Sequence, residues 1–166
     1  MKRIIIAFFI ILIGFILQTT IFPAIAIGGI VPNILILITS IYGMMRGDRI
    51  GIIVGFICGL LADVFFGNLL GLCAFIYMFL GFICGKFHQV FYPDDFKLPA
   101  VILISSDLIY GISYYLMFFM LRGRFDFSYY LVNIILPELV YTTVVAVVVY
   151  PLMLLGEKHL LKKEMY

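Results

Sequence analysis

Three acidic side chains lie inside strongly apolar stretches of the chain, and their chemistry most needs an explanation: Asp63, Asp107 and Glu138. A charged group inside a membrane is costly, so such a residue usually faces a bundle interior, a cavity or a partner. No basic residue lies within the same apolar stretches. Three roles are therefore open for these acids: a hydrogen-bonded anchor between helices, the wall of a cavity, or a proton or ion relay.

Asp63 lies in the stretch GIIVGFICGLLADVFFGNLLG, residues 51–71. If a helix begins at Ile50, Asp63 is about 20 Å along it, because each residue adds 1.5 Å. Gly67 and Asn68 follow, so we expect the helix to end there. Besides a proton or ion relay, two interpretations stay open for its carboxylate. The carboxylate caps the start of the next helix or bonds loop amides, or it is a polar anchor in a crevice for a partner's helix.

Glycines recur around Asp63 at four-residue spacing, and four of them make three consecutive GxxxG steps. In lipid, small residues let helix backbones approach closely, which drives packing there. Each step advances about 400°, so the stripe winds slowly round the helix. We expect a surface for helix packing or partner docking made by Gly47, Gly51, Gly55, Gly59, Asp63, Gly67 and Gly71. Whether its partner lies inside the chain or in another protein is open.

Asp107 and Glu138 lie about ten and eight residues into two later apolar stretches, so both fall within the membrane core. One interpretation is that they bond nearby hydroxyl groups of Ser105, Ser106, Tyr110 and Tyr141. The other is that they line a binding cavity. Pro137 precedes Glu138, frees a backbone carbonyl one turn back and favours a kink.

No motif predicts catalysis. The chain has no HExxH, GxSxG or Walker sequence and no nucleophile beside a base. Cys58, Cys73 and Cys84 form no CxxC pair, which favours core thiols. We therefore expect no catalytic residue, no metal, no cofactor and no enzymatic activity. The net charge is only +2, without a polybasic run, so nucleic acid is not an expected partner.

Composition then decides the class of protein that positions these residues. The 166-residue chain is 65% hydrophobic and 12% charged, with a mean hydropathy of +1.23. Soluble domains are about half apolar and about a quarter charged. We predict an all-α integral membrane protein, a single six-helix bundle over residues 1–166, with spans at residues 4–22, 32–45, 50–66, 69–87, 98–121 and 130–155. The second span is short, which favours local thinning or a tilted, partly re-entrant segment.

Basic residues predict the orientation, because short cytoplasmic loops carry the excess of Lys and Arg. With both termini in the cytoplasm, nine of the eleven basic residues lie inside: Lys2, Arg3, Arg46, Arg49, Lys86, Lys97, Lys158, Lys162 and Lys163. Only Arg122 and Arg124 then lie outside. Tyr114, Tyr115, Tyr129 and Tyr130 gather near the predicted outer end, as in an interfacial aromatic belt.

Two motifs resemble a known family. Gly59-Leu60-Leu61-Ala62-Asp63, followed by Gly67 and Leu70-Gly71, resembles the GLLxD…G…LG signature of the rod shape-determining protein MreD family. Pro32-Asn33-Ile34-Leu35 resembles the Pro-Asp-Leu-Leu start of that family's second span. Asn33 replaces the usual acid, which puts in doubt any role needing a charge there. The length of the chain and its number of predicted spans also resemble those of the family.

The resemblance implies a non-enzymatic scaffold of the bacterial cell-elongation complex, in the cytoplasmic (inner) membrane. It implies MreC as partner, with RodA, its penicillin-binding transpeptidase and, indirectly, MreB. It also implies a fold like the substrate-binding subunit of energy-coupling-factor transporters. The rival interpretation is therefore a vitamin-capturing subunit whose cavity is lined by Asp107, Glu138 and the outer tyrosines. Ile11 four residues after Ala7, and the lack of Trp, favour the scaffold.

Overall fold

A computed structural model of the chain describes residues 2–26, 28–66, 71–90, 96–119, 123 and 126–164, with only the backbone for residues 2–4 and 157–164. Over these residues the chain is helical and forms no sheet. Five stretches are long and apolar enough to cross a membrane: Ile5–Ala24, Asp48–Phe66, Leu72–Val90, Lys97–Phe118 and Phe127–Gly156. The predicted all-α membrane protein is therefore confirmed, with five long helices where six spans were expected.

The remaining predicted span is the short helix α3 (Ile34–Arg46). Its 13 residues make it about 20 Å long, against a hydrocarbon core of about 30 Å. Every residue from Ile34 to Met44 is buried, because α3 contacts α1, α4, α5, α6 and α8. A helix that is apolar all round is stable when it is enclosed on all sides. α3 is thus the central element around which the longer helices pack.

Two of the long helices are composite. The first consists of α1 (Lys2–Ile16), the π-helical turn η1 (Leu17–Ile21) and α2 (Phe22–Ala24). The last consists of α7 (Phe127–Tyr130), the π-helical turn η4 (Leu131–Ile135) and α8 (Leu136–Glu164). The first runs slightly past its predicted end at residue 22, and the last begins slightly before its predicted start at residue 130.

Each π-helical turn ends two residues before a proline, Pro23 or Pro137. A proline ring clashes with the carbonyl four residues earlier, here that of Thr19 or Asn133, and a widened turn relieves that clash. The Thr19 hydroxyl and the Asn133 amide each donate to a carbonyl one turn back, at 2.9 Å. The break predicted at Pro137 therefore takes the form of a π turn.

The middle of the chain forms a hairpin of α4 (Asp48–Phe66) and α5 (Leu72–Lys86), which continues into the 3₁₀ turn η2 (Phe87–Val90). Helix α6 (Lys97–Phe118) follows. Gly47 and Gly71 have φ values of 88° and 101°, which glycine adopts without strain, and they end α3 and begin α5. The fourth span was predicted from residue 69, but Gly71 delays the helix to Leu72. The fifth ends at Phe118 rather than 121.

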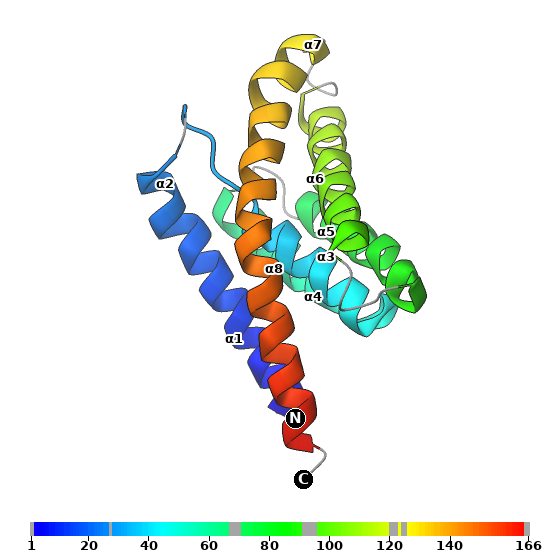
Figure 1. The fold of residues 1–166 in the computed structure, drawn as a ribbon. Coiled ribbons are helices and arrows are strands. Elements are labelled where there is room, and N and C mark those ends of the chain that lie inside the picture. Colours follow the sequence, from blue (N-terminus) through cyan, green and yellow to red (C-terminus); the bar gives the residue numbers. More distant parts are fainter. Residues whose placement is uncertain are drawn as a thin grey trace.

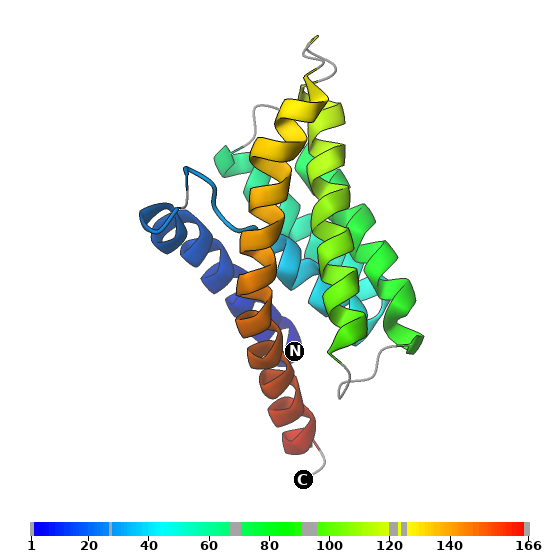
Figure 2. The same cartoon turned by 45° about the horizontal axis from the view of Figure 1, so that its top comes forward.

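Figure 1 shows how the helices are arranged. The blue α1 and the orange to red α8 lie close where α1 begins, and they diverge toward α2. Turning the molecule shows the same divergence, with the hairpin of α4 and α5 behind α8 (Figure 2). The start of α1 and the end of α8 lie at the same end of the molecule in both views.

Candidate functional site

The glycine stripe of α4 lies against α5 within the chain. A Cβ added at Gly51, Gly55 or Gly59 would clash with the backbone of Gly81, Tyr77 or Ala74, respectively. The order of these contacts shows that the two helices run antiparallel. Gly81 and Gly85 of α5 make the same kind of close contact with α4. A Cβ added at these positions would clash with the backbone of Gly51 or Asp48, respectively. Backbones in direct contact leave no room for a partner's helix.

The other predicted members of this surface have different positions. Gly47 forms the turn between α3 and α4, where an added Cβ would meet only the His88 ring, at 3.8 Å. Gly71 is the residue before α5, and an added Cβ would have no neighbour within 4 Å. Gly67 lies outside the described residues. Among the described residues, Gly47 and Gly71 therefore lie outside the contact that Gly51, Gly55 and Gly59 make with α5.

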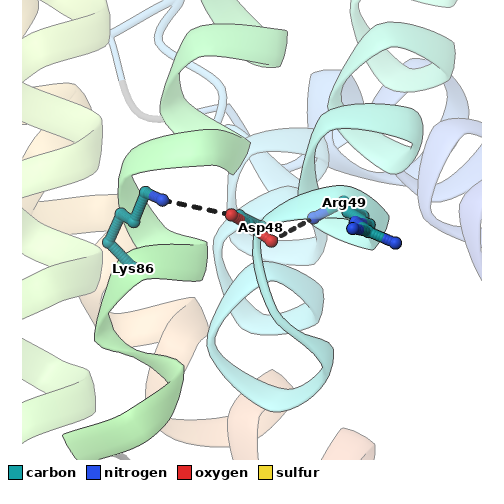
Figure 3. Close-up of polar contacts among 3 residues, drawn as sticks. All are labelled: Asp48, Arg49 and Lys86. Atoms are coloured by element: carbon teal, nitrogen blue, oxygen red, sulfur yellow. Dashed lines mark hydrogen bonds and ion pairs between the residues drawn. The ribbon is translucent and has the colours of Figure 1, made fainter.

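An ion pair lies at one end of the α4–α5 contact. Lys86 Nζ is 3.2 Å from Asp48 Oδ2, and Asp48 Oδ1 accepts the Arg49 N–H at 2.8 Å (Figure 3). Both side chains of the pair are exposed, so the pair contributes little to stability. The pair shows that Asp48 of α4 lies opposite Lys86 of α5.

Asp63 caps α5 from the neighbouring helix. Its side chain is 1% exposed, and its Oδ2 accepts the N–H groups of Gly71 and Ala74, both at 2.9 Å. Oδ1 accepts the N–H of Cys73 at 3.0 Å. The first N–H groups of a helix have no partner within it, and negative charge is favourable there. These contacts match the capping interpretation, and such burial keeps the carboxylate away from a partner's helix.

A cavity lies at the N-terminal end of α3; we call it the Glu138 cavity. Its volume is about 280 Å³. Six helices and turns contribute to its wall, which consists of Gln18, Pro23, Val31, Asn33, Ala62, Phe66, Cys73, Tyr77, Tyr110, Tyr114 and Glu138. It therefore combines one acid, two amides and three phenol rings in an otherwise apolar part of the molecule.

Asn33 organises the wall of this cavity. Its Oδ1 accepts the Ile36 N–H at 3.3 Å, as an N-cap of α3, and the Tyr77 hydroxyl at 2.8 Å. Its own N–H donates to Thr142 Oγ1 at 3.2 Å. Gln18 Oε1 accepts the Leu35 N–H at 3.1 Å. The start of α3 is thus tied to α5, α8 and η1, and the cap needs an acceptor oxygen rather than a charge.

We expect Asn33→Leu to lower the free energy of unfolding by about 2–6 kcal/mol. Buried donors left without acceptors cost about 1–3 kcal/mol each, and two donors lose theirs here. Thermal unfolding in a mild detergent measures the change. The control is Asn133→Leu, because the Asn133 side chain is exposed and bonds only within its own helix. An equal loss in both variants would contradict this role of Asn33.

Asp107 lies apart from the Glu138 cavity. It lines a separate cavity of about 30 Å³, between α6 and α8, which is large enough for one water. The side chain is 4% exposed, and neither carboxylate oxygen makes a well-formed hydrogen bond within the described residues. Thr142 lines the same small cavity. Within the described part of the chain, Asp107 and Glu138 thus line two different cavities.

Three of the four hydroxyl groups expected near the acids bond elsewhere. Ser105 and Ser106 donate to the Val101 and Ile102 carbonyls of their own helix, and the Tyr141 hydroxyl donates to the Ile25 carbonyl. This follows from helix geometry, because a serine easily bonds the carbonyl one turn back. Hydroxyl proximity in sequence was therefore a poor guide to the partners of Asp107 and Glu138.

Of the four tyrosines expected at a cavity, Tyr114 lines the Glu138 cavity. Tyr115 and Tyr130 are buried in an aromatic cluster with Phe119 and Phe127, and Tyr129 is exposed. Sequence reasoning missed Tyr77 as a wall residue and considered Tyr110 only as a bonding neighbour. The spacing of Tyr110 and Tyr114 by one helical turn was a usable signal, whereas Tyr77 had none.

A large apolar groove lies between α1 and α8, and we call it the α1–α8 groove. Its volume is about 750 Å³, and α3 forms its floor. The walls and floor include Ile6, Ile10, Ile13, Leu17, Ile34, Ile38, Tyr42, Val144, Val145, Val148, Val149, Leu152 and Met153. Sequence reasoning missed the groove, because its residues are as apolar as those that face lipid.

No group of three or more His, Cys, Asp or Glu that could hold a metal exists among the described residues. A family model described as rod shape-determining protein MreD matches residues 1–158. No curated protein and no solved structure matches the chain. The likeness to the transporter subunit therefore stays a prediction.

Proposed function

Because this chain belongs to the MreD family of rod shape-determining proteins, we propose that it is a non-enzymatic membrane scaffold that docks MreC and helps control lateral peptidoglycan synthesis. Rod shape determination is the role of the family. The docking of MreC, and contact through it with RodA, the transpeptidase and MreB, are the parts that we propose. We place the chain in the bacterial inner membrane with both termini in the cytoplasm, on the distribution of its basic residues.

The α1–α8 groove is the observation that carries this proposal. The glycine stripe is already covered by α5, and Asp63 is buried, so neither offers a surface to a partner. In lipid, helices associate through close packing rather than the hydrophobic effect. A groove with two walls and a floor gives a single helix more packing contacts than a convex face does.

The α8 wall suits such a helix. Its residues Val144, Val145, Val148 and Val149 line the groove, and valine has essentially one favoured rotamer in a helix. Rigid side chains lose little conformational entropy when a partner covers them. We therefore place the single membrane span of MreC in this groove.

Val148→Trp is expected to reduce co-purification of MreC at least tenfold, because an indole ring at this position fills the groove. Tenfold corresponds to about 1.4 kcal/mol, less than one well-packed side chain contributes. The control is Val101→Trp on α6, which makes the same change at a residue of similar exposure, 63% against 60%. Val101 lines no part of the groove.

The measurement is quantitative mass spectrometry of tagged protein purified from its native membranes in a mild detergent. Equal expression and equal thermal stability of the two variants are required first. Loss of MreC in both variants, or in neither, would contradict docking in the groove.

A further inference from the structure

The proposed scaffold role does not involve the residues that line the Glu138 cavity. The carboxyl group of Glu138 is mostly buried within a chain that spans a membrane. Such a group needs a proton or a cation beside it, since an isolated charge is costly there. None of the described lining residues is Lys, Arg or His. Of the residues that the structure describes, none therefore supplies a positive charge to this cavity.

The amide groups of the wall are largely engaged. The side-chain oxygens of Asn33 and Gln18 accept hydrogen bonds from N–H groups at the start of α3, and Asn33 also accepts one from the Tyr77 hydroxyl. Asn33 is also the hydrogen-bonding neighbour of Glu138. The carboxyl group thus has Asn33 as a neutral neighbour and Asp107 as a nearby acid, and it lines a hollow of about 280 Å³.

Phenol rings form the rest of the wall. Tyr77 and Tyr110 pack edge to face with ring centroids 5.4 Å apart, and Tyr110 and Tyr114 are 5.7 Å apart. The faces of aromatic rings attract cations, above all organic ammonium groups. Hard metal ions instead need about six oxygen ligands, and the described residues form no cluster of acids that could supply them.

From this combination we propose that the Glu138 cavity binds an organic ammonium group, held by the carboxylate of Glu138 against the rings of Tyr110 and Tyr114. The volume lies just below the range of about 300–1,000 Å³ for drug-sized ligands. A trimethylammonium or ethanolammonium group fits such a space better than a whole cofactor. The ammonium group belongs either to a free small amine or to a phospholipid head group.

The test uses the purified full chain in nanodiscs of phosphatidylglycerol, which has no ammonium group. Choline and ethanolamine are the probes, and saturation-transfer NMR measures their binding. We expect Glu138→Gln to weaken binding of these probes at least tenfold, because it removes the charge and keeps the shape. Asp48→Asn is the control, since Asp48 is an exposed acid outside the cavity.

Native mass spectrometry of protein extracted from membranes distinguishes the two sources. Retention of phosphatidylethanolamine over phosphatidylglycerol, lost in Glu138→Gln, would assign the site to a head group. Binding of the free probes alone would assign it to a small amine. If Glu138→Gln does not fold, Tyr114→Leu replaces it, with an expected loss of at least about threefold. The proposal is overturned if neither probe nor lipid binds selectively, or if the cavity variant binds as well as the Asp48→Asn control.

Discussion

Leucine in place of Gly55 is expected to push α4 and α5 apart and to cost about 3 kcal/mol or more of stability. Even the first added carbon would clash with the carbonyl of Tyr77. Extra atoms in a packed core cost about 1–3 kcal/mol when side chains can adjust. Here the obstacle is backbone, which cannot rotate away, so the cost lies at or above the upper end. Typical total stability is only about 5–15 kcal/mol.

Thermal unfolding and the yield of monodisperse protein measure this effect. Gly156→Leu is the matched control, because an added Cβ at Gly156 meets nothing within 4 Å. That variant should be neutral or slightly stabilising, since a helical glycine costs about 0.5–1 kcal/mol relative to alanine. Similar melting temperatures for the Gly55 and Gly156 variants would show that the two helices do not touch through their backbones.

The second large effect is expected for Asp63→Leu, which should cost about 3–5 kcal/mol. The change removes the acceptor of three N–H groups at the start of α5. A buried donor without an acceptor costs about 1–3 kcal/mol. Rearrangement of the turn before α5 reduces the total loss. Asp63→Asn keeps one acceptor oxygen and should lose roughly half as much.

Hydrogen exchange distinguishes capping from a role in docking. In Asp63→Leu, the amides at the start of α5 should exchange faster, while those in the middle of α4 change little. If exchange at α5 is unchanged, the carboxylate does not cap the helix. Loss of MreC from this variant would not by itself identify a docking residue, because the fold is weakened as well.

The sequence predicted the parts of the fold that depend on local chemistry. Apolar length placed the long helices to within a few residues, and the spacing of Gly51, Gly55 and Gly59 predicted a close helix contact. Capping by Asp63 was one of the open interpretations. It followed from Gly67 and Asn68, which indicated the end of α4 just after Asp63. In each case the residue type itself strongly favours one local structure. Such a feature can be predicted without knowing which distant residues are in contact.

The remaining features depend on which helices become neighbours. Asp107 and Glu138 looked equivalent in the sequence, but each lines a different cavity. Tyr77 reaches Asn33 across 44 positions of sequence. The α1–α8 groove is invisible in the sequence, because a groove wall and a lipid-facing surface have the same composition. Only the positions of the helices distinguish them.

The most direct test of the account is a photo-crosslinking residue placed at Val148 in the native membrane, with the same residue at Val101 as control. We expect a covalent adduct between position 148 and the membrane span of MreC, and none at position 101. An adduct at both positions, at 101 alone, or with a transporter's coupling subunit would contradict docking of MreC in the α1–α8 groove.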